Sequence, residues 1–199
     1  MKVSLSWLKE YIPVDLPPQQ IADKLTMAGL EVDGVESLYD YLDHVVLARV
    51  TEVKKHPNAD TLSCCMVDVG EDEPVQIVCG APNVRQGMIV ACATPGAVLP
   101  GGLKIKKSKL RGEKSCGMLC SASELRLASD ASGIMDLEEG SPPGTPLETA
   151  LNISDTVFEI DLTPNRPDCL SVIGVAREIG AFTKPLGQVK LPEVVLPED

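Results

Sequence analysis

The sequence predicts a multidomain α+β protein in which a small β-barrel is inserted into a helical domain. Residues 47–127 hold short apolar runs separated by glycines, with no periodic segment of helix length among them. The segments on both sides of this stretch do carry apolar residues at helical spacing. The first of these flanks has too few apolar residues to fold alone, so we expect the two flanks to share one core.

The barrel prediction rests on five runs of strand length, namely Leu47–Val53, Leu62–Val69, Val75–Cys79, Met88–Ala93 and Met118–Cys120. Short β-branched segments separated by glycine turns are typical of a small barrel or sandwich. A stretch of about 80 residues with five strands has the size of an oligonucleotide/oligosaccharide-binding (OB) barrel.

The flank before the barrel predicts two short helices and a strand. Ser6 can cap the first helix, which should end at Pro13. Pro17 and Pro18 favour the start of the second helix, and Gly29 is placed to follow its end. The alternation of residues 30–33 then predicts a half-buried strand.

The flank after the barrel supplies the missing apolar surface. Residues 128–150 are rich in Ser, Gly, Pro and acidic side chains, which predicts a loop with little core. Residues 157–162 alternate as a strand, and a helix should follow from Ser171. The expected domains are the first half of a split domain at 1–40, the barrel domain at 41–150, the second half of the split domain at 151–190 and a linker at 191–199.

The charge of the barrel stretch differs from that of the rest of the chain, whose formal net charge is −11. Residues 47–127 hold 11 Lys/Arg against 8 Asp/Glu, whereas the remainder holds 7 against 21. The excess lies in a basic segment, residues 104–114, in which a strand would place Lys104 and Lys106 on one face and Lys107 on the other. Clustered cations on a barrel indicate a nucleic-acid backbone site, but lysines that protect a solvated edge strand give the same pattern.

The seven cysteines do not predict a metal site or a disulfide framework. The chain contains no CxxC pair, and neither histidine lies in a ligand pattern. Cys64 and Cys65 are consecutive in an expected strand, so they point to opposite faces and cannot both bind one ion. We expect reduced and mostly buried thiols.

The sequence also lacks the patterns of a catalytic site and of a membrane segment. No GxGxxG or GxxxxGK phosphate loop occurs, and no nucleophile and base are placed to act together. No run approaches 18 uninterrupted apolar residues, and the first residues do not resemble a signal peptide.

Several motifs, in a fixed order, resemble a known family. HPNADTL, QIVCGAPNV, PGAVLP, KLRG and SCGMLCS are similar to the tRNA-binding OB domain shared by several synthetases and free-standing tRNA-binding proteins. The flanking motifs MKVSLSWLKEYI, GLEVDGVE and TPNRPDCLSVIGVAREIGA resemble the β subunit of bacterial phenylalanyl-tRNA synthetase. This resemblance covers residues 1 to about 190.

The resemblance implies a non-catalytic part of a phenylalanine–tRNA ligase. It implies a small helical, winged-helix-like domain interrupted by an OB-fold tRNA-binding domain. The expected partners are tRNA, the α subunit and the remainder of the β subunit in a cytoplasmic α₂β₂ assembly. Amino-acid activation, with ATP and magnesium, belongs to the α subunit and editing to a later part of the β chain, so no cofactor or metal is expected here.

The candidate RNA-binding residues are the basic segment, the corner at residues 54–58 and the end of the barrel. They are Lys54, Lys55, His56, Asn58, Lys104, Lys106, Lys107, Lys109, Arg111, Lys114, Ser121 and Glu124. Because residues 47–127 contain no Phe, Tyr or Trp, contacts should be mostly to phosphate and sugar. The alternative is a structural assembly module without significant tRNA contact. A free-standing tRNA chaperone would not need the split flanking domain.

Overall fold

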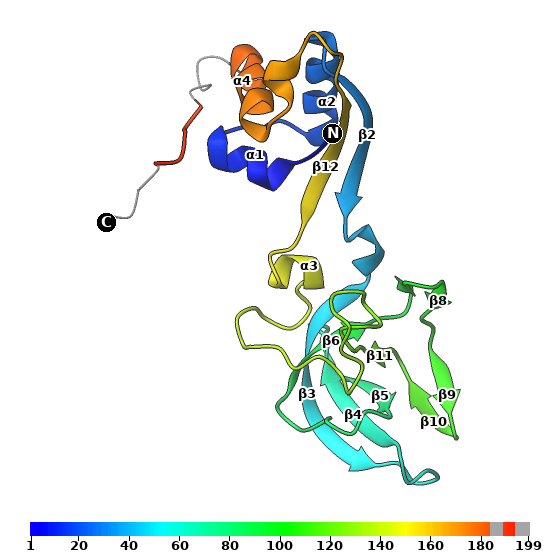
Figure 1. Ribbon diagram of the computed structural model, residues 1–199. Coiled ribbons are helices and arrows are strands. Elements are labelled where there is room, and N and C mark those ends of the chain that lie inside the picture. Colours follow the sequence, from blue (N-terminus) through cyan, green and yellow to red (C-terminus); the bar gives the residue numbers. More distant parts are fainter. Residues whose placement is uncertain (184–188, 194–199) are drawn as a thin grey trace, which may run out of the picture. The chain divides into compact units, whose positions relative to one another are not determined.

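The computed structural model describes residues 1–183 and 189–193 and contains two compact units. The split unit consists of Met1–Leu38 and the chain from Ser154 onwards, and the barrel unit consists of Tyr39–Ile153 (Figure 1). Residues 194–199 of the expected linker lie outside the described residues. No helix in the described part of the chain is long and apolar enough to cross a membrane.

A three-stranded antiparallel sheet forms the base of the split unit. Its order is β1-β12-β2, with β1 at Lys2–Ser4, β12 at Asp155–Asp161 and β2 at Glu31–Leu38. The central strand therefore comes from the second chain segment and pairs with two strands of the first. The strand β1 was not predicted, because three residues are too few to display an alternation.

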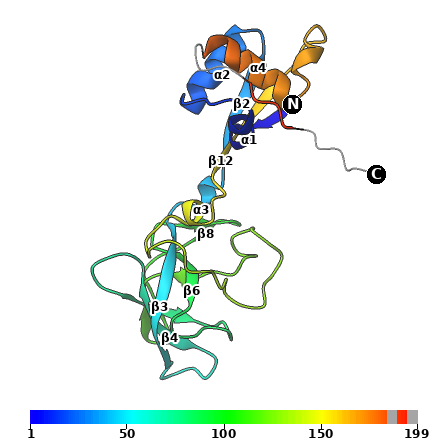
Figure 2. The same cartoon turned by 90° about the vertical axis from the view of Figure 1, so that its left-hand side faces the viewer.

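The helices of the split unit are α1 (Leu5–Tyr11), α2 (Pro18–Met27) and α4 (Val172–Phe182), with a short 3-10 turn at Pro167–Cys169. Figure 2 views the unit from its helical side. Side chains from both chain segments share one core, in which Leu8, Ile21, Phe158 and Ile179 are all fully buried. Where the sequence predicted a small helical, winged-helix-like domain, the described part of this unit thus has three α-helices and a three-stranded sheet.

The cap of the first helix differs from the prediction. Ser4, not Ser6, is the N-cap of α1, and its Oγ accepts a hydrogen bond of 3.1 Å from the N–H of Trp7. Ser4 has the extended backbone that an N-cap needs because it ends β1. The hydroxyl of Ser4 and the backbone N–H of Ser6 both donate to the Asp155 carboxylate, at 2.5 and 2.9 Å. The two serines therefore join the start of α1 to the start of β12.

The barrel unit contains all five expected strands. They are β3 (Val45–Lys55), β4 (Ser63–Asp68), β5 (Val75–Cys79), β6 (Ile89–Ala93) and β11 (Met118–Leu119), in the order β11-β6-β3-β4-β5. The open ends of this sheet approach one another, since Cys116 donates its N–H to the carbonyl of Gln76 in β5 at 2.8 Å. The sheet is therefore a nearly closed barrel.

Two apolar cores stabilise the barrel unit. One includes Val50, Val67 and Val90, whereas the other includes Val45 and Leu147. Residues 128–150 contribute little core, as predicted, because only Ile134, in the first core, and Leu147, in the second, are buried there. Leu147 begins the short helix α3 (Leu147–Ala150), and a 3-10 turn spans Asp40–Leu42.

The basic segment does not form the single strand that alternation suggested. It is divided between two hairpins, β7 (Val98–Leu99) with β8 (Leu103–Lys104), and β9 (Ser108–Leu110) with β10 (Glu113–Ser115). Between them Ile105 is buried while Lys106 and Lys107 are both exposed. The hydrophobic side chain of Ile105 anchors the connection, so the neighbouring lysines do not follow strand alternation.

Candidate nucleic-acid interface

The most strongly basic feature is the hairpin Ser108–Ser115, here called the basic hairpin. Its strands pair Lys109 directly opposite Lys114. The turn residues Arg111 and Gly112 have φ values of 50° and 100°, as in the two-residue turns that suit the twist of a hairpin. Like charges directly opposite one another destabilise a strand pair, so another part of the protein must hold this hairpin.

His56 and Asn58 hold the turn of the basic hairpin through its main chain. The Nε2 of His56 lies 3.0 Å from the carbonyl oxygen of Leu110, and its Nδ1 accepts the N–H of Asn58 at 3.1 Å. Because Nδ1 is an acceptor, Nε2 carries the proton and donates to Leu110. The side-chain amide of Asn58 donates to the carbonyl of Arg111 at 3.2 Å. We call these contacts the clamp.

A second attachment joins the other strand of the hairpin to β5. The side-chain amide of Gln76 donates to the carbonyl of Lys114 at 2.9 Å and to the carboxylate of Glu113 at 3.2 Å. The only acidic residue of the basic segment is thus engaged by Gln76. Ser115 completes the attachment, because its Oγ accepts the N–H of Val78 at 3.1 Å.

The predicted cationic contacts are exposed, but they are not equivalent. Lys54, Lys55, Lys104, Lys106, Lys107, Lys109, Arg111 and Lys114 all lie at the surface. Lys54 forms an ion pair with Glu52 at 2.8 Å, so its charge is partly neutralised. Among the described residues, no carboxylate lies within ion-pair distance of the six cations of the basic segment. Lys107, Lys109 and Lys114 line a shallow hollow on the basic hairpin.

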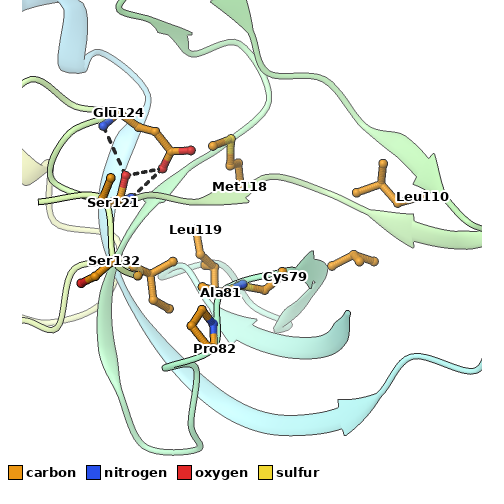
Figure 3. A pocket seen from close by; sticks show the side chains of 14 residues that line it. Cys79, Ala81, Pro82, Leu110, Met118, Leu119, Ser121, Glu124 and Ser132 are labelled. Atoms are coloured by element: carbon orange, nitrogen blue, oxygen red, sulfur yellow. Dashed lines mark hydrogen bonds between the residues drawn. The ribbon is translucent and has the colours of Figure 1, made fainter. Parts of the chain in front are cut away.

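The other candidates, which carry no positive charge at neutral pH, form structural hydrogen bonds. His56 is only 5% exposed and Ser121 only 7%, so neither presents its side chain freely to a ligand. Ser121 and Glu124 form a capping box, in which one Glu124 oxygen accepts both the N–H and the hydroxyl of Ser121 at 2.7 Å (Figure 3). The second oxygen of Glu124 receives no hydrogen bond from the described residues.

A pocket opens between the basic hairpin and the capping box (Figure 3), and we call it the barrel pocket. Its lining combines nearly buried aliphatic side chains, Val78, Leu119 and Ile134, with the partly exposed Leu110 of the hairpin. Among the described residues that line it, Glu124 is the only charged one. Sequence analysis identified Ser121 and Glu124 but not the pocket that they border.

Asn83 shapes this pocket and was missed from the sequence. Its side-chain amide donates to the carbonyl of Ile134 at 2.8 Å, and its oxygen accepts the N–H of Ile134 at 3.0 Å. These two bonds attach the 131–134 loop to the barrel, so that Ile134 becomes one wall of the pocket. Asn83 belongs to the motif QIVCGAPNV, which was the available signal for a functional role. Its partner Ile134 lies 51 residues further along the chain, so the contact could not be read from the sequence.

Five of the seven cysteines, all except Cys64 and Cys116, are buried. All seven are free, and burial raises the pKa of Cys65, of Cys92 and of Cys120 to about 12. A thiol with such a pKa is almost entirely protonated at neutral pH, so it is a poor nucleophile and a poor metal ligand.

One cluster in the split unit has the residue types of a metal site. Asp168, Cys169 and Glu178 place ligand atoms within 4.8 Å of one another. The guanidinium of Arg166, however, contacts all three, at 3.0 Å from Asp168, 3.0 Å from Cys169 and 2.6 Å from Glu178. A cation is therefore already present at the centre of the cluster, which does not fit a magnesium site. The hydrogen bond from Arg166 lowers the pKa of Asp168 to about 2.

Comparison with known proteins identifies relatives of both units. The family model described as "Putative tRNA binding domain" matches residues 45–146. The chain is 53% identical over 200 residues to the phenylalanine–tRNA ligase beta subunit of Syntrophus aciditrophicus, covering 100% of this chain and 24% of the relative. It is 58% identical over 181 residues to that of Geobacter sulfurreducens, covering 91% and 22%. The chain thus spans about a quarter of the length of these curated relatives.

Among solved structures, the MetRS related protein from Pyrococcus horikoshii matches with a TM-score of 0.39 and 22% identity. The match covers 52% of this chain and 87% of that protein.

Proposed function

Because the chain belongs to the tRNA-binding domain family, we propose that its barrel unit binds tRNA through the basic hairpin and the adjoining lysines. The observation that carries this assignment of residues is the opposed pair Lys109 and Lys114. Like charges in this arrangement destabilise the free hairpin, and a phosphate between them would turn repulsion into attraction. Lys104, Lys106, Lys107 and Arg111 extend the cationic surface on either side.

The mode of binding follows from what the surface offers. A local net charge of +3 on residues 47–127 has to attract RNA against the acidic remainder of the chain, so the contact surface should be small. Lysines and an arginine contact phosphates without reading sequence. We infer that discrimination among tRNA species by these cations is slight.

The parent protein is proposed to be a phenylalanine–tRNA ligase β subunit. The similarity to such subunits extends over the whole of this chain, but only over about a quarter of theirs. We therefore assign to this chain a non-catalytic, tRNA-binding role in protein biosynthesis. Ligase activity, with its ATP and magnesium, association with an α subunit in an α₂β₂ assembly and a cytoplasmic location are proposals for the complete enzyme.

We also propose a specific fold for each of the two units. The strand order β11-β6-β3-β4-β5, with β11 returning towards β5, suits the five-stranded, partly open Greek-key barrel of the OB fold. The split unit is proposed to be the winged-helix-like domain into which this barrel, at 41–150, is inserted.

The test is the salt dependence of tRNA binding to the 199-residue chain. Three phosphate contacts give a log–log slope of about −2 to −3, with affinity on the order of 10 to 100 µM at physiological salt. Replacing Lys109 and Lys114 by Ala should weaken binding to every tRNA alike and flatten the slope by about 0.7 to 0.9 for each phosphate that the variant no longer binds. The triple replacement of Lys104, Lys106 and Lys107 should act in the same way.

The matched control is Lys9→Ala, which removes the same charge from an exposed position of α1 in the split unit. It should leave the slope unchanged. If the hairpin variants bind tRNA with the original slope, these lysines do not contact phosphate. If they also prevent assembly of the complete ligase, the cations serve a protein interface, which is the alternative function.

A further inference from the structure

We propose that the barrel pocket binds one unpaired base of the tRNA, and that Glu124 selects a base carrying an exocyclic amino group. The proposal rests on the proposed function, because the basic hairpin must first bring the RNA backbone to the barrel. It adds a base-reading element to an interface whose cations cannot read sequence.

The lining of the pocket excludes a phosphate. None of its described lining residues is Lys, Arg or His, and its only charged member is the carboxylate of Glu124. A phosphate would meet a like charge there without any cation to compensate. The pocket is therefore suited to a neutral group that donates hydrogen bonds.

A nucleobase fits the two kinds of surface in the pocket. Val78, Leu119 and Ile134 form nearly buried aliphatic surface on which the apolar face of a base can pack. Because residues 47–127 contain no aromatic side chain, such aliphatic walls are the available replacement for aromatic stacking in this stretch. Because Glu124 lines the same pocket, the polar edge of the base would then face its carboxylate.

The capping box fixes which hydrogen bonds Glu124 can make. One carboxylate oxygen is held by the N–H and the hydroxyl of Ser121, both at 2.7 Å, so the side chain cannot turn freely. The other oxygen is an acceptor without a partner among the described residues. An exocyclic amino group, as on adenine or cytosine, is the matching donor.

Leu110 connects the pocket with the phosphate-binding surface. It lines the pocket and is 43% exposed, although its neighbours in the chain are the cations Lys109 and Arg111. The clamp fixes Leu110 through the bond from His56 to its carbonyl. A nucleotide whose phosphate contacts Lys109 or Arg111 can therefore turn its base past Leu110 into the pocket.

The test uses two fluorescein-labelled RNA hexamers that differ only in one group. One is an adenosine hexamer, and the other is a purine riboside hexamer, which lacks the 6-amino group. Fluorescence anisotropy with the complete chain at low salt should show the adenosine hexamer binding about tenfold more tightly, the value of a charge-assisted hydrogen bond. In Glu124→Gln the amide oxygen can still accept from Ser121, but the NH₂ then faces the base, so this preference should fall to about one.

The matched control is Glu73→Gln, an identical change at an exposed position outside the barrel pocket, which should keep the tenfold preference. Filling the pocket with Ala81→Leu should weaken the adenosine hexamer more than the purine riboside hexamer and so remove the preference, while circular dichroism verifies that the variant is folded. Equal binding of the two hexamers to the unaltered chain, failure of the adenosine hexamer to bind, or an unchanged preference in Glu124→Gln overturns the inference. The salt slope for tRNA would still depend on Lys109 and Lys114 in that case, so the proposed function is judged separately.

Discussion

Removal of the clamp should loosen the basic hairpin while leaving its cations in place. His56→Ala deletes the 3.0 Å hydrogen bond to Leu110 and, by releasing the Asn58 N–H held at 3.1 Å, also removes the support of the Asn58 bond to Arg111. At about 1 kcal/mol for each bond, the closed hairpin loses about 2 kcal/mol, which raises the population of the open hairpin about 30-fold. His56→Gln retains a donor for Leu110 and should lose about half as much.

The assay is amide hydrogen exchange of residues 108–115, measured by NMR on the complete chain. Exchange through local opening should accelerate about 30-fold in His56→Ala and less in His56→Gln. The affinity for tRNA should fall by a smaller factor, because it scales with the fraction of closed hairpin, which stays high. The control His44→Gln changes the other histidine, whose side chain is 54% exposed, and should alter neither quantity.

A specific result would refute this reasoning. If His56→Ala lost most of its tRNA affinity while hairpin exchange stayed unchanged, His56 would contact RNA directly. The structural role assigned to it would then be wrong.

Two further predictions concern the split unit. Burial alone would raise the pKa of Asp155, but hydrogen bonds from Ser4, Ser6 and Thr156 together hold this pKa below its ordinary value. The ionised carboxylate therefore stabilises the fold above about pH 4. This stabilisation is lost as the pH falls through the lowered pKa. Urea unfolding from pH 2.5 to pH 6 should show a smaller acid loss in Asp155→Asn, and equal losses would contradict the assignment. A Cβ at Gly174 would lie 2.0 Å from the carbonyl oxygen of Asp168. Gly174→Ala should therefore lower the free energy of unfolding in urea by roughly 3 kcal/mol or more. The control is Gly34→Ala, whose added Cβ would make an ordinary contact of 3.9 Å.

The elements that sequence analysis predicted correctly have strong local patterns. The helix α4 begins directly after its N-cap Ser171 and carries buried residues at helical spacing, so its start and its buried face follow from the chain alone. The strands β3 to β6 are five to eleven residues long and are flanked by turn residues. Each of these signals lies within one segment and needs no knowledge of the fold.

The missed features depend on contacts between distant segments. The hairpin strands β7 to β10 are two or three residues long, and their exposed lysines give no apolar alternation. The clamp joins His56 to Leu110, and Asn83 pairs with Ile134, over separations of 54 and 51 residues. Sequence reasoning therefore found the polar residues of the candidate site but not the hydrogen bonds by which His56 and Ser121 support their neighbours.

The clamp contacts only main-chain oxygens of the hairpin, at Leu110 and Arg111. Every residue type offers the same carbonyl, so the clamp places no demand on side-chain identity at these positions. Exposed residues of the hairpin can therefore be exchanged while its attachment is retained, provided that the turn keeps Gly112. An engineer could use this independence to rewrite the charge pattern of the barrel unit, for example to prepare neutral or acidic hairpins on an unchanged scaffold.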